Sequence, residues 1–394
     1  MDLKLSAADL AFRDEVRAFL DENVPASMRR VSDLTSGFIV DPDVSIAFHR
    51  ALARKGWSVP DWPTEHGGTG WTPAQRYIFN AECGRVGAPT HNSAGSHFVG
   101  PVLIRFGTRE QQAKYLPRIR SGEDHWAQGY SEPGSGSDLA SLKTRAEPDG
   151  DDYVVNGQKI WTTFAHKSNR LFMLVRTSSS GKRQEGITFL LVDMDTRGIT
   201  VRPIIGSGGD HEFNEVFFDN VRVPKANRVS DENKGWDVAK YLLEFERGGS
   251  VVAGRTRDAF AKLVTLLGAR AAKESLLVAR VAELGTDLDA MEMLEISVLS
   301  AVQAGSNPGP ISSLLKLRWS EIRQSIVELA VDAIGDDALR WTSERPFYEI
   351  LQLPPDQEEV LAITARYLNS RAYTIMGGTS EIQTNILAKT LLGL

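Results

Sequence analysis

The residues best suited to ligand chemistry lie in a stretch rich in glycine and serine at 128–141, which reads QGYSEPGSGSDLAS. Small residues let a ligand approach the backbone, whose N–H groups can hold a phosphate or a heteroaromatic ring together with the serine hydroxyls. The same composition also fits a surface loop between a helix and a strand. No Gly-Lys-Ser/Thr follows the run, and it lacks the GxGxxG pattern after a strand. Neither common nucleotide-binding fingerprint therefore applies.

The elements that must position this stretch follow from hydrophobic periodicity. Apolar residues recur at helical spacing over 6–122, except at 57–70, where Pro and Gly predict an ordered loop whose two tryptophans pack against other residues. Over 126–223 the period is two, and an Asn-Gly pair at 156–157 predicts a hairpin turn among several short strands. Helical spacing returns over 236–394. This order predicts an α+β fold with a small barrel or sandwich in the middle.

Composition excludes several classes of protein. The 394 residues include 45 basic and 51 acidic side chains, for a net charge of −6, and 42% are hydrophobic, enough for a large core. The single cysteine, Cys83, allows neither an internal disulfide nor a two-cysteine zinc site, so we expect a cytoplasmic protein without a metal. The chain has no apolar run of about 18 residues, no signal-peptide core and no basic block. We therefore expect neither a membrane nor a nucleic-acid partner.

Three motifs resemble those of the acyl-CoA dehydrogenases and occur in that family's order. They are YSEPGSGSDLAS at 130–141, NGQKIWTT at 156–163 and GTSEIQ at 378–383. The stretch GTREQQAKYLP at 107–117 is similar to the family as well. The resemblance therefore covers nearly the whole chain.

The resemblance implies a helical N-terminal domain at 1–125, a middle β-barrel at 126–233 and a C-terminal four-helix bundle at 234–394, with FAD held noncovalently between subunits. The implied reaction is α,β-desaturation of an acyl-CoA thioester. A carboxylate removes the α proton while the β hydrogen leaves as hydride to the flavin N5, and electrons then pass to an electron-transfer flavoprotein or a similar carrier. Because the flavin carries the redox step, the protein must supply a base, donors to the thioester carbonyl and a dry pocket.

By position in these motifs, the resemblance assigns roles to individual residues. Ser131 falls where the family hydrogen-bonds the flavin ring, and Trp161 and Thr163 match residues that pack on the ring and donate to its reactive edge. Without its motif, Trp161 would be interpreted as an aromatic residue of the barrel core. Ser137 and Arg247 are predicted to contact the acyl-CoA. The predicted cofactor contacts are Gln128, Tyr130, Ser131, Gly136, Ser137, Trp161, Thr163, Thr379 and Glu381.

The catalytic base is the first departure from the family pattern. Many members carry it in a Tyr-Glu-Gly-Thr sequence, but here Gly377 stands at the position of that Glu. Other members place a Glu directly before an Arg on an earlier helix, which corresponds to Glu246 and Arg247.

Val238 and Leu242 begin an apolar stripe, and Glu246 lies one turn beyond Leu242, at the edge of the buried face. Burial raises a carboxyl pKa, which suits a base. The alternative is a solvated carboxylate, although the facing helix positions carry no basic partner.

A second departure concerns the subunit interface. Members that form symmetric homotetramers carry Arg-x-Gln-Phe-Gly and Gly-Gly-x-Gly segments that contact the FAD of a neighbouring subunit. Here the corresponding regions read AKLVTLLGAR at 261–270 and IGDD at 334–337, and an Asp near FAD phosphates is unfavourable. We therefore predict a hetero-oligomer in which a paralogous subunit supplies the missing contacts. This chain resembles the larger, base-bearing subunit of enzymes for steroid side-chain or dicarboxylic acyl-CoAs. The alternative is a homo-oligomer that binds FAD through different residues.

Two other functions stay open at this point. One is a family member that has lost dehydrogenation, such as a desulfinase or a nitroalkane oxidase-like enzyme, although Glu246 argues against the desulfinase. The other is a non-catalytic or half-site partner subunit, favoured by Gly377 but not by the intact flavin motifs. Replacement of Tyr-Glu by Met-Gly removes bulk and favours a branched, cyclic or otherwise wide acyl group. His91 and His97 either bind a polar end of that group or are structural.

Overall fold

The computed structural model describes residues 5–37, 39–89, 94–248, 252–268, 274–303, 309–342 and 344–394, without the side chains of 244–248, 302–303 and 348. Its first helices are α1 (Ala7–Asn23), α2 (Ala26–Leu34), α3 (Pro42–Lys55), α4 (Pro73–Arg85), α5 (Gly100–Phe106) and α6 (Arg109–Ser121). The strands are β1 (Trp126–Gly129), β2 (Arg145–Asp149), β3 (Asp152–Lys159), β4 (Arg170–Arg176), β5 (Ile187–Asp193), β6 (Ile199–Ile205), β7 (His211–Pro224) and β8 (Arg228–Val229). The later helices are α7 (Gly235–Gly248), α8 (Ala253–Leu267), α9 (Ser275–Gln303), α10 (Ile311–Ile334), α11 (Phe347–Ile350), α12 (Pro355–Ser370) and α13 (Ser380–Leu387).

The N-terminal helices enclose an aromatic core. The buried face of α1 consists of Phe12, Val16, Phe19 and Leu20. Trp57 packs against Phe12 with ring centroids 6.1 Å apart. Trp62, from the same Pro- and Gly-rich loop, is buried and donates its indole N–H to the Ser96 carbonyl at 2.7 Å. The structure therefore confirms an ordered loop with packed tryptophans.

The middle of the chain forms an eight-stranded sheet in the order β6-β7-β3-β2-β4-β5-β8, with β1 paired in parallel to β4. Alternate side chains of β4 enter two different cores, because successive residues of a strand point to opposite faces. Phe172 and Leu174 pack with residues of α5, α6 and α7, whereas Leu171 and Met173 pack with residues of β3 and β7. This arrangement fixes the sheet against the helices on either side of it in the sequence.

The predicted hairpin turn at Asn156-Gly157 is wrong. Both residues lie inside β3, whose register with β7 shifts between Val155 and Gly157. Gly157 adopts φ 151°, and a Cβ at this position would lie 2.6 Å from the Thr144 hydroxyl. The glycine therefore allows a close, irregular strand contact instead of a turn. The tight turn lies at Gly150-Asp151, between β2 and β3, and Gly150 adopts φ 58°.

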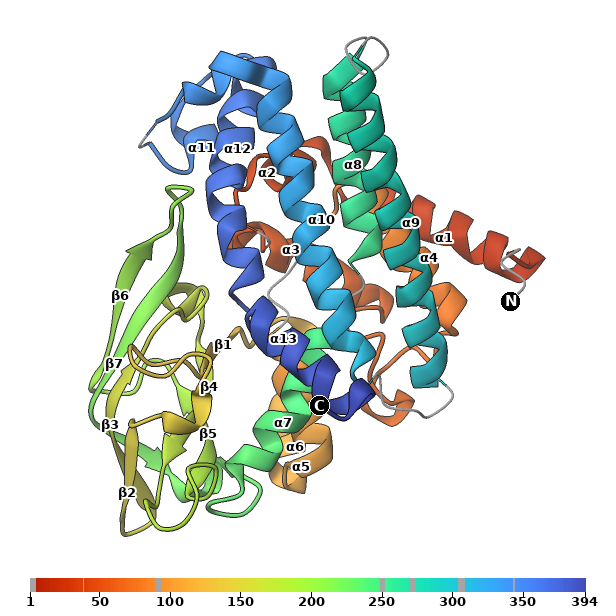
Figure 1. The fold of residues 1–394 in the computed structure, drawn as a ribbon. Helices are drawn as coiled ribbons and strands as arrows, with labels where there is room; N and C mark the ends of the chain where they lie inside the picture. Colours follow the sequence, from red (N-terminus) through yellow and green to blue (C-terminus); the bar gives the residue numbers. More distant parts are fainter. Residues whose placement is uncertain are drawn as a thin grey trace.

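The helices α8, α9, α10 and α12 run side by side as a bundle with one apolar core (Figure 1). An ion pair between Arg30 and Glu358 joins α2 to α12. The β6–β7 hairpin contacts the same helix, because the Ser207 hydroxyl donates to the Leu368 carbonyl at 3.0 Å. The N-terminal helices, the sheet and the bundle therefore meet along α12. Among the described residues, no helix has the length and apolarity needed to cross a membrane.

Candidate active site

The Gly/Ser stretch begins at the end of β1 and continues as a loop outside the sheet. A narrow turn closes it, because the Glu132 N–H donates to the Ser135 carbonyl at 3.0 Å and the Ser135 N–H donates back at 2.9 Å. Gly136 and Ser137 are exposed, and apart from the two chain neighbours of Gly136 no described residue comes within 4 Å of where a Cβ on it would lie. The backbone at the tip of this loop is therefore accessible to a ligand.

Gln128, Tyr130 and Ser131 lie at the base of the loop. Tyr130 is buried, and its ring packs edge-on against two phenylalanines of β4 and β5, so its side chain supports the sheet core. Gln128 and Ser131 are half-buried. The Ser131 carbonyl accepts the N–H of Ile160 at 2.9 Å. This hydrogen bond joins the first predicted motif to the second.

A buried ion pair anchors the same loop. Lys159 at the end of β3 is fully buried, and its Nζ lies 2.8 Å from Glu132 Oε1 and 3.2 Å from the Tyr130 carbonyl. Glu132 also accepts the backbone N–H groups of Lys143 and Thr144 at 2.6 and 2.9 Å. Burial lowers the pKa of Lys159 to about 8. Burial alone would raise the pKa of Glu132, but Lys159 and these hydrogen bonds outweigh it and hold that pKa below its usual value.

Sequence reasoning missed this ion pair, although the strand pattern carried a signal for it. Tyr153, Val155 and Lys159 share one face of β3 at period two, and the first two are fully buried. A lysine on such a face is buried and requires an acidic partner. Glu132, in the neighbouring motif, is that partner.

Trp161 follows β3 on a backbone with φ 59°, a conformation that bulky L-residues rarely adopt. Its ring is 57% exposed and meets Phe213 edge-on at 6.1 Å, so its interpretation as a core aromatic is wrong. The next residue fixes the turn: Thr162 N–H donates to the Asn214 carbonyl at 3.0 Å, and Asn214 Nδ2 donates to the Thr162 carbonyl at 2.9 Å. Thr163 follows, half-buried. A large ring held out of the core by a strained backbone is typical of a ligand-stacking surface.

Glu212 supports this turn from β7, since its carbonyl accepts the N–H of Phe164 at 2.8 Å. Its carboxyl faces Gly37, where a Cβ would lie 2.5 Å from Glu212 Oε2. Burial, together with the nearby Asp210, raises the pKa of this carboxyl to about 8. The sequence pattern gave no signal for this carboxyl.

Glu212→Gln is expected to stabilise the protein more at about pH 8.5 than at about pH 5.5. The folded state raises the pKa of Glu212, so the stability that its proton provides is lost as the pH rises from about 4.3, the value in an unfolded chain, toward 8. Gln resembles the protonated side chain and loses nothing in that window. Melting temperatures of variant and wild type at both pH values measure the effect, with Glu215→Gln on the same strand as the control. A gain that does not change with pH would contradict the prediction.

Thr379 caps α13, where its hydroxyl accepts a backbone N–H at 3.3 Å. Just before it, Gly377 and Gly378 adopt φ 64° and 89°, a left-handed conformation that any side chain at the missing Glu position would strain. Lys316 Nζ donates to the Gly378 carbonyl at 2.8 Å and holds this segment on α10. Glu381 is exposed in the first turn of α13, and hydrogen bonds from its own N–H and from Thr379 lower the pKa of its carboxyl.

The helix predicted to carry the Glu-Arg pair is α7. Its residues Val238 and Leu242 are fully buried in the core that α7 shares with α5, α6 and the sheet. Glu246 and Arg247 fall in the last turn of α7. Their side chains lie outside the described part of the structure. Their assignments as base and as substrate contact therefore stay predictions.

Of the two histidines considered for the acyl end, His91 lies outside the described residues. His97, in the short helix Ala94–Val99, lies with Nδ1 2.9 Å from the Ser96 hydroxyl and Nε2 3.8 Å from Asp61 Oδ2. Burial lowers the pKa of His97, although Asp61 opposes the shift. These contacts support a structural role for His97.

The two altered interface segments lie at ends of bundle helices. Residues 261–268 form the end of α8 and the residue after it, whereas 269–270 lie outside the described residues. Asp336 and Asp337 are exposed on the short helix Gly335–Leu339 that follows α10.

Known proteins match the chain along nearly its whole length. The models for acyl-CoA dehydrogenase match residues 6–123 (N-terminal domain), 127–221 (middle domain) and 233–392 (C-terminal domain). The acyl-CoA dehydrogenase IpdE1 of Mycobacterium tuberculosis is 39% identical over 389 residues, which cover 97% of each chain. The solved Tcur3481-Tcur3483 steroid ACAD has a TM-score of 0.84 at 28% identity, with 100% of this chain and 99% of that chain covered. The ChsE4-ChsE5 complex from Mycobacterium tuberculosis has a TM-score of 0.82 at 28% identity, with the same coverage.

The helix–sheet–helix order, the motifs joined by the Ser131–Ile160 hydrogen bond and these three domain matches agree. The chain belongs to the acyl-CoA dehydrogenase family, whose enzymes are oxidoreductases that act on CH–CH bonds.

Proposed function

We propose that the protein is an FAD-dependent dehydrogenase that desaturates the α,β bond of a wide acyl-CoA thioester, such as one with a branched or steroid side-chain acyl group. The observation that carries this proposal is Trp161, whose 57% exposed ring is held by a strained turn beside an accessible Gly/Ser loop. The likeness to a solved steroid ACAD supports the acyl class.

The residues present fit FAD. The Trp161 ring offers a face for stacking next to Thr163, and the loop at Gly136 and Ser137 offers N–H groups and a hydroxyl to phosphate oxygens. Thr379 stands at the N-terminus of α13, where free backbone N–H groups favour a negative charge. Ser131, Gln128 and Glu381 would complete the contacts, with the Tyr130 backbone. When bound, FAD supplies the acceptor for a hydride.

A residue of the chain itself would remove the α proton of the thioester. The Glu246 carboxylate would take the α proton and become a carboxylic acid, while the β C–H bond breaks and its electron pair leaves with the hydrogen. The fully buried Val238 and Leu242 on the same helix would keep water from this carboxylate. Arg247 and Ser137 would hold the acyl-CoA.

A second subunit and an electron carrier complete the proposed enzyme. The ChsE4-ChsE5 complex and the Tcur3481-Tcur3483 steroid ACAD are each named as a pair of different proteins. This pairing supports a paralogous partner for this chain. The exposed Asp337 stands where the family segment has a glycine that would contact a neighbour's FAD, which supports a partner that is not a second copy. We propose an electron-transfer flavoprotein as the acceptor of the electrons.

The proposal is tested by purifying the chain alone and with a paralogous subunit, and by measuring FAD per chain and acyl-CoA-dependent reduction of an artificial acceptor. A panel of straight, branched, dicarboxylic and steroid side-chain thioesters identifies the acyl class. Activity with wide acyl groups that needs the partner is expected. One tightly bound FAD per chain in a homo-oligomer would contradict the hetero-oligomer, and no reduction by either preparation would contradict the dehydrogenase.

Trp161→Ala is expected to weaken FAD binding by roughly 2- to 13-fold, since aromatic stacking contributes about 0.5 to 1.5 kcal/mol. The exposed ring contributes little to the apo fold, so its melting temperature should not fall. Fluorescence titration of the apo protein with FAD measures the affinity. Trp341→Ala, which removes another exposed indole, is the control and should leave FAD affinity unchanged. Equal affinity in wild type and Trp161→Ala would show that Trp161 does not stack on the flavin.

A non-catalytic partner subunit is the second candidate, and one observation favours it. Gly377 has no carboxylate at the position where many relatives carry their base, and its left-handed backbone would strain any side chain there. Under this alternative, Glu246 has no chemical role. Substitution of Glu246, discussed below, separates the two candidates.

A further inference from the structure

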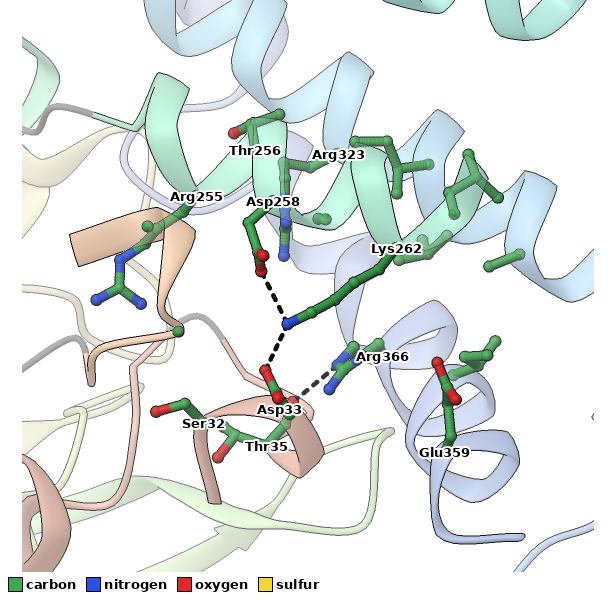
Figure 2. A pocket seen from close by; sticks show the side chains of 18 of the residues that line it. Ser32, Asp33, Thr35, Arg255, Thr256, Asp258, Lys262, Arg323, Glu359 and Arg366 are labelled. Carbon is green, nitrogen blue, oxygen red and sulfur yellow. Dashed lines mark hydrogen bonds and ion pairs between the residues drawn. The ribbon is translucent and has the colours of Figure 1, made fainter. Parts of the chain in front are cut away.

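A pocket lined by several arginines lies between α2, α8, α10 and α12 (Figure 2) and contains none of the residues assigned to the flavin. Its volume is about 130 Å³. The basic side chains on its wall are Arg255 and Lys262 of α8, Arg323 of α10 and Arg366 of α12. The acidic side chains are Asp33, Asp258 and Glu359.

Lys262 forms ion pairs with two of these acids. Lys262 Nζ lies 2.5 Å from Asp33 Oδ1 and 2.8 Å from Asp258 Oδ2, as the dashed lines in Figure 2 show. Lys262 offsets one of these two negative charges, and Glu359, the third acid of the wall, is exposed. The four basic and three acidic side chains of the wall therefore leave a net charge of +1. The part of the wall formed by the arginines therefore carries an excess of positive charge.

The guanidinium groups of the three arginines donate few hydrogen bonds to other residues. Arg366 and Arg255 each donate to one backbone carbonyl, at 3.1 and 2.6 Å. Arg323 bonds to the Tyr373 hydroxyl, yet its Nε–H is buried and has no hydrogen-bond partner among the described residues. No ion pair within the described part of the chain engages any of these guanidinium groups. The half-buried arginines therefore have donors left over for a ligand, and the buried Arg323 Nε–H is one of them.

Arg323 also repels the other two arginines. Burial lowers the pKa of Arg255 to about 10, with Arg323 adding to the shift, and burial and Arg323 lower the pKa of Arg366. Arg323 therefore lies within electrostatic reach of both. An anion at this place would relieve the repulsion, and a carboxylate matches the fork of a guanidinium with two parallel N–H···O bonds.

Much of the remaining wall is apolar. It is formed by Val40, Leu263, Leu266, Trp319, Ile326, Val327, Ala330 and Ile363. Hydrocarbon beside a carboxylate suits an organic acid better than a free inorganic ion. We propose that this pocket binds the carboxylate of an organic acid, with Arg323 as its central contact and Arg255 and Arg366 on either side.

Two sources would supply this carboxylate. One is the far end of an acyl-CoA that carries a second carboxylate, and this source rests on the proposed function. Arg255 stands in the first turn of α8, which follows the helix of Glu246 in the chain. The other source is a free dicarboxylic acid that acts as an effector.

Isothermal titration calorimetry separates these sources with adipate, adipyl-CoA and hexanoyl-CoA as the probes. If the acyl group supplies the carboxylate, adipyl-CoA is expected to bind roughly 10- to 100-fold more tightly than hexanoyl-CoA, which has the same carbon number and no second charge. If the acid binds free, adipate gives saturable heat and the two thioesters bind alike. Arg323→Met should remove either effect, and Arg323→Lys should weaken it. Arg318→Gln, on α10 but outside the pocket, should preserve it.

The pocket assignment is overturned if adipate does not bind and adipyl-CoA binds no more tightly than hexanoyl-CoA. It is also overturned if Arg323→Met and Arg323→Lys both bind these probes as tightly as the wild type does. Circular dichroism verifies that each variant is folded. Because calorimetry reports binding and not turnover, tight adipyl-CoA binding without oxidation would reject the proposed function and leave this pocket assigned.

Discussion

Glu246→Gln is expected to lower kcat for acyl-CoA-dependent reduction of an artificial acceptor by roughly 10²- to 10⁴-fold, the usual contribution of a positioned general base. Gln keeps the size of the side chain and one of its two acceptor oxygens but cannot accept the α proton. FAD content and acyl-CoA affinity should therefore change little. Steady-state kinetics together with the flavin absorbance of the purified variant measure both quantities.

Glu244→Gln is the matched control, because it removes a carboxylate from the same helix at a position that the sequence places away from the buried face. Its kcat should stay within about twofold of wild type, as expected for a solvated side chain. Full activity in Glu246→Gln would reject the base assignment. If the wild type itself shows no acyl-CoA-dependent reduction with its paralogous partner, the non-catalytic subunit becomes the better explanation.

The sequence predicted the order of the elements because each has a periodic pattern of its own. The buried faces of α1 and α7 and the two-sided burial of β4 follow directly from spacings of three to four and of two. The Asn-Gly pair misled because a glycine in a strand serves close contact as well as a turn. Gly157 meets Thr144, a tertiary contact that spacing along the chain does not reveal.

The motifs located the candidate site, but not what holds it in place. Ser131 and Trp161 were found because their neighbours in sequence are distinctive. The partners that fix them come from elsewhere: Lys159 reaches Glu132 from the end of β3, and Asn214 reaches Thr162 from β7. Arg255, Arg323 and Arg366 share a pocket although they stand on three different helices, so their proximity exists only once the bundle has formed.

Lys159→Met is expected to lower the free energy of unfolding by about 3 to 5 kcal/mol, because it leaves the buried Glu132 carboxylate without its counter-ion. The two backbone N–H groups that also bond Glu132 would remain, but they carry no full charge. The loop at 131–138 should loosen, so hydrogen exchange there should rise and FAD should be retained less well. Urea denaturation of the apo protein measures the stability, and mass spectrometry of exchanged peptides measures the loop.

A matched control lies on the same loop, where Asp138 pairs with Arg183 at 2.7 Å while both side chains are more than half exposed. Arg183→Gln should cost no more than about 1 kcal/mol, since solvent screens an exposed pair. The double variant Glu132→Gln/Lys159→Met removes both buried charges and should recover much of the loss, because most of the cost arises from one unpaired charge. If Lys159→Met is no less stable than Arg183→Gln, the buried pair does not anchor the loop. If the double variant is as unstable as Lys159→Met, packing of the lysine stem, and not its charge, holds the loop in place.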